Sequence, residues 1–205
     1  MTDTHKTSME ESREVAVPEP YLKTLEKKVK DLETLIDVSS RISSTLDFNR
    51  LVDICMENAK MVMNAEACSL LIYNRETQCL EFAYAVSGEK VTGCELKKKC
   101  TLKMGQGIAG WVAENLETVI IEDASKDKRF FSGVDKITDF KTTSLVAVPL
   151  VGRSGLIGVA EILNPKDRKS FNEYDADIFH TLCRQISSAF ENAKYYKESL
   201  QMERV

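Results

Sequence analysis

Hydrophobic residues in the first quarter of the chain follow a helical spacing after a polar start. Residues 1–20 are rich in threonine, serine and glutamate, which predicts a disordered tail. Residues 21–46 carry apolar side chains in a seven-residue repeat beside a charged face, which predicts a helix. That helix could pack on its own domain or pair in parallel with a second copy, and we favour a dimer helix because the apolar seam is narrow. The two series are Leu22, Val29, Ile36, Ser43 and Leu25, Leu32, Ser39, Leu46.

Short apolar runs with strand spacing and longer amphipathic segments alternate along the rest of the chain. This order predicts an α+β fold with a central antiparallel or mixed sheet of about six strands. The N- and C-terminal helices would cover one face of that sheet. Helices are expected over residues 48–63, 108–115, 134–141 and 171–201, and strands over 67–73, 79–86, 101–104, 119–122, 145–150 and 155–163.

Composition and charge exclude several classes of protein. The chain has 205 residues, of which 43% are hydrophobic, and its formal charge of −4 argues against nucleic acid as a partner. It has no run of about 18 apolar residues that would span a membrane and no secretory signal at its start, so we expect a cytoplasmic location. Six cysteines and two histidines without metal-ligand spacing favour free thiols, and we expect no cofactor. Cys55, Cys68, Cys79 and Cys183 fit apolar patterns as core residues, whereas Cys94 and Cys100 flank a run of lysines.

One carboxylate interrupts the most apolar strand, residues 155–163. Burying a carboxylate without a partner is costly or shifts its pKa upward. Glu161 should therefore face a cavity, accept local hydrogen bonds or face water. The alternation of a strand also permits an exposed position, and that alternative stays open.

The short helix expected over residues 134–141 carries small polar side chains. Asp135, Thr138 and Thr142 are three and four residues apart, so they should share a helical face. Short side chains near a helix N-terminus can hold a hydroxyl or a phosphate close to the backbone. The alternative is ordinary helix capping by Asp135.

Three glycines open the helix expected over residues 108–115. Gly105, Gly107 and Gly110 have the spacing of a dinucleotide-binding turn, and glycines there allow close backbone approach. The fingerprint also needs an acidic residue about 20 positions further on, where Ser125 stands. We therefore do not expect nicotinamide or flavin binding.

Taken together, these segments resemble the GAF domain family from about residue 35 to residue 192. The resemblance is carried by residues 105–113 (GQGIAGWVA), 140–150 (FKTTSLVAVPL) and 156–164 (LIGVAEILN). They are similar to the subclass found in cyclic-nucleotide phosphodiesterases and bacterial adenylyl cyclases. The resemblance implies a PAS-like GAF fold over residues 47–192, followed by a helical extension over 193–205. Asp139 stands where the family usually has a glycine. In one member of the subclass an acidic residue after the second strand reads the purine, and in this chain Ser87 stands near that position.

The resemblance also implies roles for particular positions. Seven would contact the ligand: Ser69 at the base edge, Ala109 at the floor, Phe131 through its backbone, Asp135, Thr138 and Thr142 around ribose and phosphate, and Glu161 from the sheet. Four would form a structural motif: Asn164, Lys166, Phe171 and Asp175, in which Lys166 and Asp175 could pair.

The resemblance implies a sensor of small molecules and not an enzyme. We expect the ligand to be a cyclic nucleotide and the protein to act as a homodimer through its terminal helices. Because the chain ends at Val205, we expect the signal to pass to a separate output protein. Two alternatives stay open. One is a dimerisation scaffold without a ligand, and the other, less favoured because Ala109 replaces a thiol, is an enzyme similar to the free methionine sulfoxide reductases.

Overall fold

The computed structural model describes residues 28, 48–87, 90–91, 96 and 100–202. The predicted tail over residues 1–20 and, apart from Lys28, the predicted dimer helix over 21–46 lie outside the described residues, as does Cys94. Within the described part of the chain, none of the helices combines the length and the hydrophobicity that crossing a bilayer requires.

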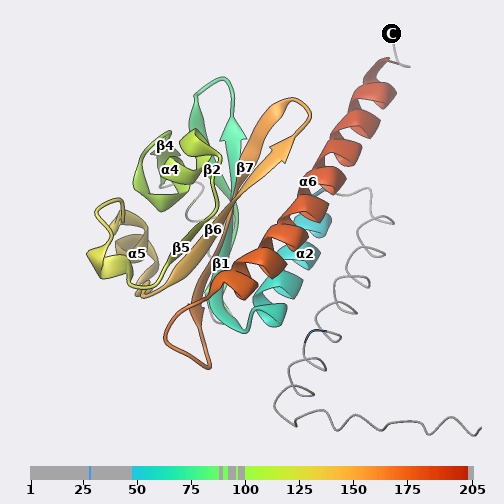
Figure 1. Ribbon diagram of the computed structural model, residues 1–205. Helices are drawn as coiled ribbons and strands as arrows, with labels where there is room; N and C mark the ends of the chain where they lie inside the picture. Colours follow the sequence, from blue (N-terminus) through green and yellow to red (C-terminus); the bar gives the residue numbers. More distant parts are fainter. Residues whose placement is uncertain (1–27, 29–47, 88–89, 92–95, 97–99, 203–205) are drawn as a thin grey trace, which may run out of the picture.

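The described chain forms one sheet with helices on both sides (Figure 1). The helices are α2 (Phe48–Val62), α4 (Gly107–Asn115), α5 (Gly133–Thr138) and α6 (Glu173–Met202), with a 3-10 turn η1 (Ala124–Lys126). The strands are β1 (Ala65–Asn74), β2 (Cys79–Ser87), β3 (Lys90–Val91), β4 (Thr101–Lys103), β5 (Val119–Ile121), β6 (Leu145–Gly152) and β7 (Gly155–Pro165). They lie in the order β3-β2-β1-β7-β6-β5, and β4 pairs with the same edge of β2 as β3 does. Every described pairing is antiparallel, so the sheet is antiparallel rather than mixed.

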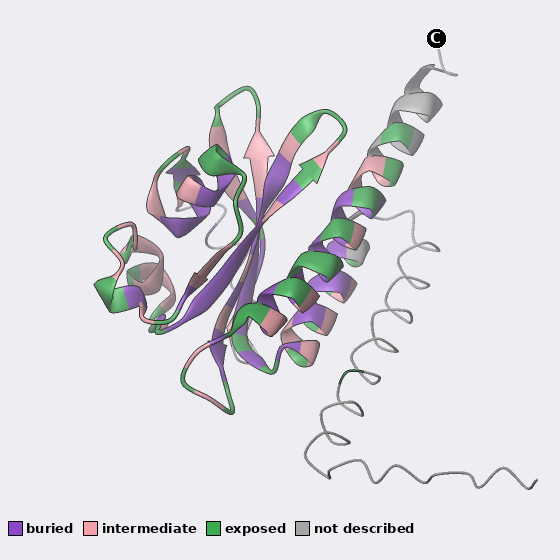
Figure 2. Cartoon of the chain, in the orientation of Figure 1, coloured by how far each residue is buried: buried purple, intermediate pink, exposed green. Residues whose placement is uncertain are grey.

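Strand alternation divides the buried side chains between two cores, one on each face of the sheet. Figure 2 shows that most of the length of the central strands is buried. In β1, Cys68 and Leu70 belong to the core beneath α2 and α6, whereas Leu71 belongs to the core beneath α4. In β7, Ile162 joins the first core and Val159 joins the second. Because both faces are covered, the central strands read as nearly continuous apolar runs.

The two terminal helices of the described chain, α2 and α6, pack against the same face of the sheet, as the sequence predicts (Figure 1). Met56 of α2 and Phe179 of α6 are fully buried there, and Leu182 and Ile186 continue the stripe along α6. Burying a side chain of this size contributes about 1.5–3 kcal/mol to folding. The later turns of α6 extend past the sheet (Figure 1).

The helix α5 is shorter than the predicted helix over residues 134–141 and ends at Thr138. Asp139 follows in the left-handed conformation, with φ of +53°. Aspartate adopts this conformation more readily than most residues, and glycine does so most readily of all. The expectation that Thr142 shares a helical face with Asp135 and Thr138 is therefore wrong, and Thr142 lies in the connection to β6.

The buried side chain of Asn164 joins the end of β7 to the segment that enters β6. Its Oδ1 accepts hydrogen bonds from the backbone N–H groups of Thr143 at 2.8 Å and Ser144 at 3.2 Å. Its Nδ2 donates to the carbonyl oxygen of Lys141 at 2.8 Å and to Oε2 of Glu66 at 2.9 Å. The backbone of Asn164 is left-handed, with φ of +51°. These bonds hold the chain on both sides of Thr142 in place.

Asp175 lies in the first turn of the helix α6 and helps to cap its N-terminus. Its Oδ2 accepts from the N–H of Asn172 at 2.9 Å, and its own N–H donates to Oδ1 of Asn172 at 3.1 Å, which caps the helix reciprocally. The expected ion pair between Asp175 and Lys166 is wrong: Asp175 pairs with Arg168 Nη2 at 2.7 Å, and Lys166 is exposed. Phe171 is buried in the core beneath α2 and α6.

We predict that Asn164→Ala lowers the free energy of unfolding by roughly 3 kcal/mol, because buried backbone donors lose their acceptor. Urea denaturation measures this loss. Asn164→Gly is the matched control, since it removes the same hydrogen bonds but relieves the left-handed backbone. If the glycine variant were as stable as the wild type, the contribution of Asn164 to stability would come from its backbone conformation and not from its hydrogen bonds.

Candidate functional site

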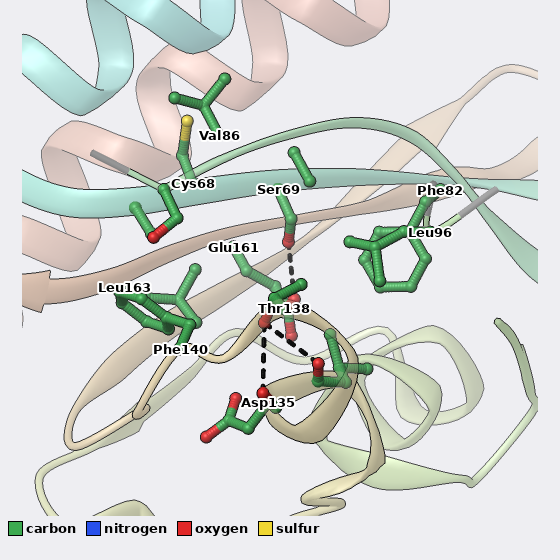
Figure 3. Close-up of a pocket in the computed structure, with 14 residues that line it drawn as sticks. Cys68, Ser69, Phe82, Val86, Leu96, Asp135, Thr138, Phe140, Glu161 and Leu163 are labelled. Atoms are coloured by element: carbon green, nitrogen blue, oxygen red, sulfur yellow. Dashed lines mark hydrogen bonds between the residues drawn. The ribbon is translucent and has the colours of Figure 1, made fainter. Parts of the chain in front are cut away.

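Glu161 lies in the middle of the sheet, on the face covered by α4 and α5. In the register of β7 it stands opposite Ser69 of β1 and Ala147 of β6. The Ser69 hydroxyl donates a hydrogen bond of 2.7 Å to Oε2 of Glu161 (Figure 3). The side chain is half-buried and lines a hollow between the sheet and α5. The structure therefore supports the interpretation that this acid faces a cavity and accepts a local hydrogen bond.

The protein environment raises the pKa of the Glu161 carboxyl. Burial is the main cause, because it disfavours the charged form. The hydrogen bond from Ser69 opposes this shift, and the negative charge of Asp135 across the hollow adds to it. Glu161 is therefore protonated over a wider pH range than an ordinary glutamate, and its protonated form can donate a hydrogen bond.

The carboxylate of Asp135 is bound to the chain that follows α5. Its Oδ2 accepts from the N–H of Thr142 and its Oδ1 from the Thr142 hydroxyl, both at 2.8 Å. The hydroxyl of Thr138 donates to the carbonyl oxygen of Val134 at 3.0 Å. The capping alternative is wrong, because Asp135 lies in the first turn of α5 and bonds to Thr142, while Ser132 occupies the N-cap position. The three expected polar residues do meet, but through these hydrogen bonds rather than through a common helical face.

Two hollows adjoin at Glu161 and Asp135, on the face of the sheet away from α2 and α6. Figure 3 shows the first of them. The first lies between β1, β2, β7 and α5 and has about 390 Å³ of space free of protein atoms, part of it open to solvent. The second lies between α4, α5, the loop before α5 and the sheet, and has about 430 Å³. All seven expected ligand contacts line one hollow or both: Ser69 and Thr138 the first, Ala109, Phe131 and Thr142 the second, and Asp135 and Glu161 both.

The N-terminus of α4 opens into the second hollow. Gly107, with φ of +71°, Ile108 and Ala109 all line that hollow. The first N–H groups of a helix have no partner within the helix and favour an anion. No lysine or arginine stands among the described residues that line either hollow. An anionic group bound here would therefore rely on backbone N–H groups rather than on cationic side chains.

Apolar and aromatic side chains make up much of the lining and were not expected from the sequence. Phe82 and Leu163 line both hollows together with Val134. Residues of this type that face a hollow and residues that fill a core follow the same pattern in a sequence. Ser87 also lines the first hollow, near the position where a purine-reading residue was sought. Asp139 is exposed and lines neither hollow.

Buried thiols of the described chain, both at the site and in the core beneath α2 and α6, are poorly suited to nucleophilic chemistry. Burial raises the pKa of both Cys55 and Cys68 to about 12, and it raises the pKa of Cys100 as well. A thiol with a raised pKa carries little of the reactive thiolate. Cys68 lines the first hollow, but it is buried and its sulfur lies 3.5 Å from the carbonyl oxygen of Met56.

A lined hollow on one face of a sheet and long helices on the other define a ligand-binding sensor domain. The GAF domain family model matches residues 45–191. The chain therefore belongs to the GAF domain family, and a GAF domain is a regulatory ligand-binding module.

The relatives are much longer than this chain. The dual 3′,5′-cyclic-AMP and -GMP phosphodiesterase 11A of Takifugu rubripes is 31% identical over 186 residues, which cover 87% of this chain and 20% of the relative. The dual phosphodiesterase 11 of Drosophila melanogaster is 28% identical over 183 residues, which cover 84% of this chain and 13% of the relative. The chain thus spans a fifth or less of these relatives. Among solved structures, the GAF domain of a phosphoenolpyruvate-protein phosphotransferase from Coxiella burnetii has the same fold, with a TM-score of 0.72, 17% identity, and coverage of 82% of this chain and 96% of that one.

We predict that Glu161→Gln stabilises the protein relative to wild type at neutral pH, and that this advantage shrinks as the pH falls. The raised pKa of Glu161 means that the folded state binds the proton more tightly than the unfolded state. Its contribution to stability is therefore full below the ordinary glutamate pKa of 4.5 and is lost as the pH rises through the raised value. Urea denaturation from about pH 4 to pH 8 measures the difference.

Glu122→Gln, at an exposed position next to β5, is the matched control for this titration. A difference between wild type and Glu161→Gln that stayed constant across the pH range would contradict burial of the carboxylate.

Proposed function

We propose that this chain is a cyclic-nucleotide sensor. The observation that carries the proposal is that the seven expected contact residues, from β1, α4, α5, β7 and two loops, line two hollows that meet at Glu161 and Asp135. Two relatives are phosphodiesterases of cyclic AMP and cyclic GMP, which supports the same class of ligand.

The two hollows would hold different parts of the ligand. In the proposed pose the purine lies in the first hollow, between apolar side chains such as Phe82 and Leu163, with Ser69 and Glu161 at its polar edge. The phosphate lies in the second hollow at the N-terminus of α4, where N–H groups supply the binding that lysine or arginine would otherwise supply. A protonated Glu161 would also repel the phosphate less than a carboxylate would.

Binding would be transmitted across the sheet to the helices. Ser69 faces the ligand side, whereas its neighbours Cys68 and Leu70 pack in the core beneath α2 and α6. A shift of β1 on ligand binding therefore reaches both helices directly. In the proposed mechanism the protein is a homodimer through its terminal helices, and their altered packing signals to a separate output protein.

One observation favours a second candidate, a dimerisation scaffold without a ligand. The hydroxyls of Thr138 and Thr142 and the carboxylate of Asp135 already bond to one another or to the backbone. A ligand must therefore compete with these bonds or add to them. Binding measurements separate the two candidates.

We predict that isothermal titration calorimetry detects binding of cyclic AMP or cyclic GMP, and that Thr142→Val weakens it about tenfold. In the proposed site the Thr142 hydroxyl contacts the ligand, and losing one hydrogen bond to a charged phosphate costs about 1.5 kcal/mol, which is about tenfold in the dissociation constant. Thr181→Val, at an exposed position on α6, is the matched control.

Absence of binding by both nucleotides would leave only the scaffold. If either nucleotide bound with equal affinity to wild type and Thr142→Val, Thr142 would not belong to the site.

A further inference from the structure

An arginine from the loop before α5 stacks on a tryptophan of α4. The guanidinium carbon of Arg129 lies 4.5 Å from the centroid of the Trp111 ring. Both side chains are half-buried. An arginine over an indole face at this distance makes a favourable cation–π contact, which is strongest for tryptophan. Neither residue is among the seven expected ligand contacts.

The guanidinium is held in its stacking orientation by Asp127. Arg129 Nε donates to Oδ1 of Asp127 at 3.0 Å and Nη2 donates to Oδ2 at 2.7 Å, so the two planar groups pair through two parallel bonds. The backbone N–H of Arg129 also donates to Oδ1, at 2.8 Å. This pairing lowers the pKa of Asp127 and raises that of Arg129, so both stay charged. The arginine is therefore presented to Trp111 in one orientation.

The stack connects an otherwise self-contained loop to α4. The hydrogen bonds that the structure shows for residues 125–130 stay within residues 123–130. The loop is anchored before this segment, where the buried Ala124 donates its N–H to the carbonyl oxygen of Thr143 at 2.8 Å. Beyond that anchor, the Arg129 stack and the half-buried ring of Phe130 connect this segment to the rest of the domain.

The residues that directly follow Arg129 form an aromatic wall of the second hollow. Phe130 and Phe131 both line it. Phe131 lies between the starts of α4 and α5: a Cβ added at Gly107 would stand 3.2 Å from the Phe131 Cβ, and one added at Gly133 would clash with the Phe131 ring. Phe131 is nevertheless 40% exposed, so it closes the hollow from the solvent side. Holding Arg129 against α4 therefore holds this wall in place.

We propose that the stack of Arg129 on Trp111, here called the latch, positions the Phe130–Phe131 wall over the second hollow and sets the rate at which a bound ligand leaves. The inference rests on the proposed function for the identity of that ligand. Arg129 and Trp111 act as positioning residues: they do not touch the ligand. Opening the latch frees the loop between Ala124 and α5, and the ligand exits past Phe131.

The chain contains a single tryptophan, so the fluorescence of Trp111 reports the latch directly. We expect Arg129→Gln to make Trp111 more accessible to acrylamide quenching and to speed hydrogen exchange at the N–H of Phe130. We expect cyclic AMP or cyclic GMP, preloaded and chased, to leave this variant about tenfold faster than wild type, with an unchanged unfolding midpoint. Arg129→Lys keeps the charge but not the forked pair with Asp127, so its rate of nucleotide release should lie between those of wild type and Arg129→Gln.

The matched control is Arg153→Gln, an exposed arginine in the turn between β6 and β7. Trp111→Phe keeps an aromatic face and should retain slow release, whereas Trp111→Ala should release the nucleotide as fast as Arg129→Gln. These two variants also test the latch if Arg129→Gln fails to fold.

The outcomes separate the latch from the proposed function. If a nucleotide binds and leaves Arg129→Gln and Arg153→Gln at the same rate, the latch is overturned and the sensor function stands. If neither nucleotide binds, the sensor function falls, and quenching and exchange in the free protein decide the latch. Faster exchange and stronger quenching in Arg129→Gln support it, and values equal to those of Arg153→Gln overturn it.

Discussion

An acid in the middle of a strand that is covered on both faces is the constraint on which the ligand face of this domain depends. Glu161 keeps a donor, the Ser69 hydroxyl, and it keeps open space beside it. If larger side chains filled that space, the carboxylate would lose its remaining access to solvent or ligand, which is expensive in a low-dielectric interior. The acid and the hollow therefore depend on each other, and the small residues Ala67 and Ala109 that surround them belong to the same arrangement.

Most of the architecture was accessible from the sequence because its strongest signals are local. The strands β6 and β7 are nearly continuous apolar runs and the helix α4 is marked by the glycines at its start, and the structure places all three within a few residues of the predicted bounds. The end of α5 was not accessible, since the identity of Asp139 does not reveal that its backbone turns left-handed. The sequence left open whether the sheet is antiparallel or mixed, because the order of strands depends on how long connections cross the sheet rather than on any one segment.

The polar half of the candidate site was accessible from the sequence through resemblance, and its apolar half was not. Side chains such as Phe82 and Val134 look like core residues until their surroundings are known. The partners of the polar residues were equally hidden. Thr142 reaches Asp135 across a loop, and Arg168 replaces Lys166 as the partner of Asp175, because such pairs depend on side-chain reach in three dimensions. Residue types indicate which groups need partners, but only packing decides which partners they find.

The last turns of α6 project beyond the sheet (Figure 1). Glu191 of α6 accepts a hydrogen bond from the backbone N–H of Arg153 at 2.6 Å, and Tyr195 lines a groove together with Ile72 and Leu156. The projecting part of the helix therefore begins after Tyr195 and ends at Met202. At 1.5 Å per residue, it is about 10 Å long, and a tilt of about 10° around Tyr195 would move its far end sideways by about 2 Å. Any change in the tilt of this helix is thus largest at its C-terminal end, away from the sheet.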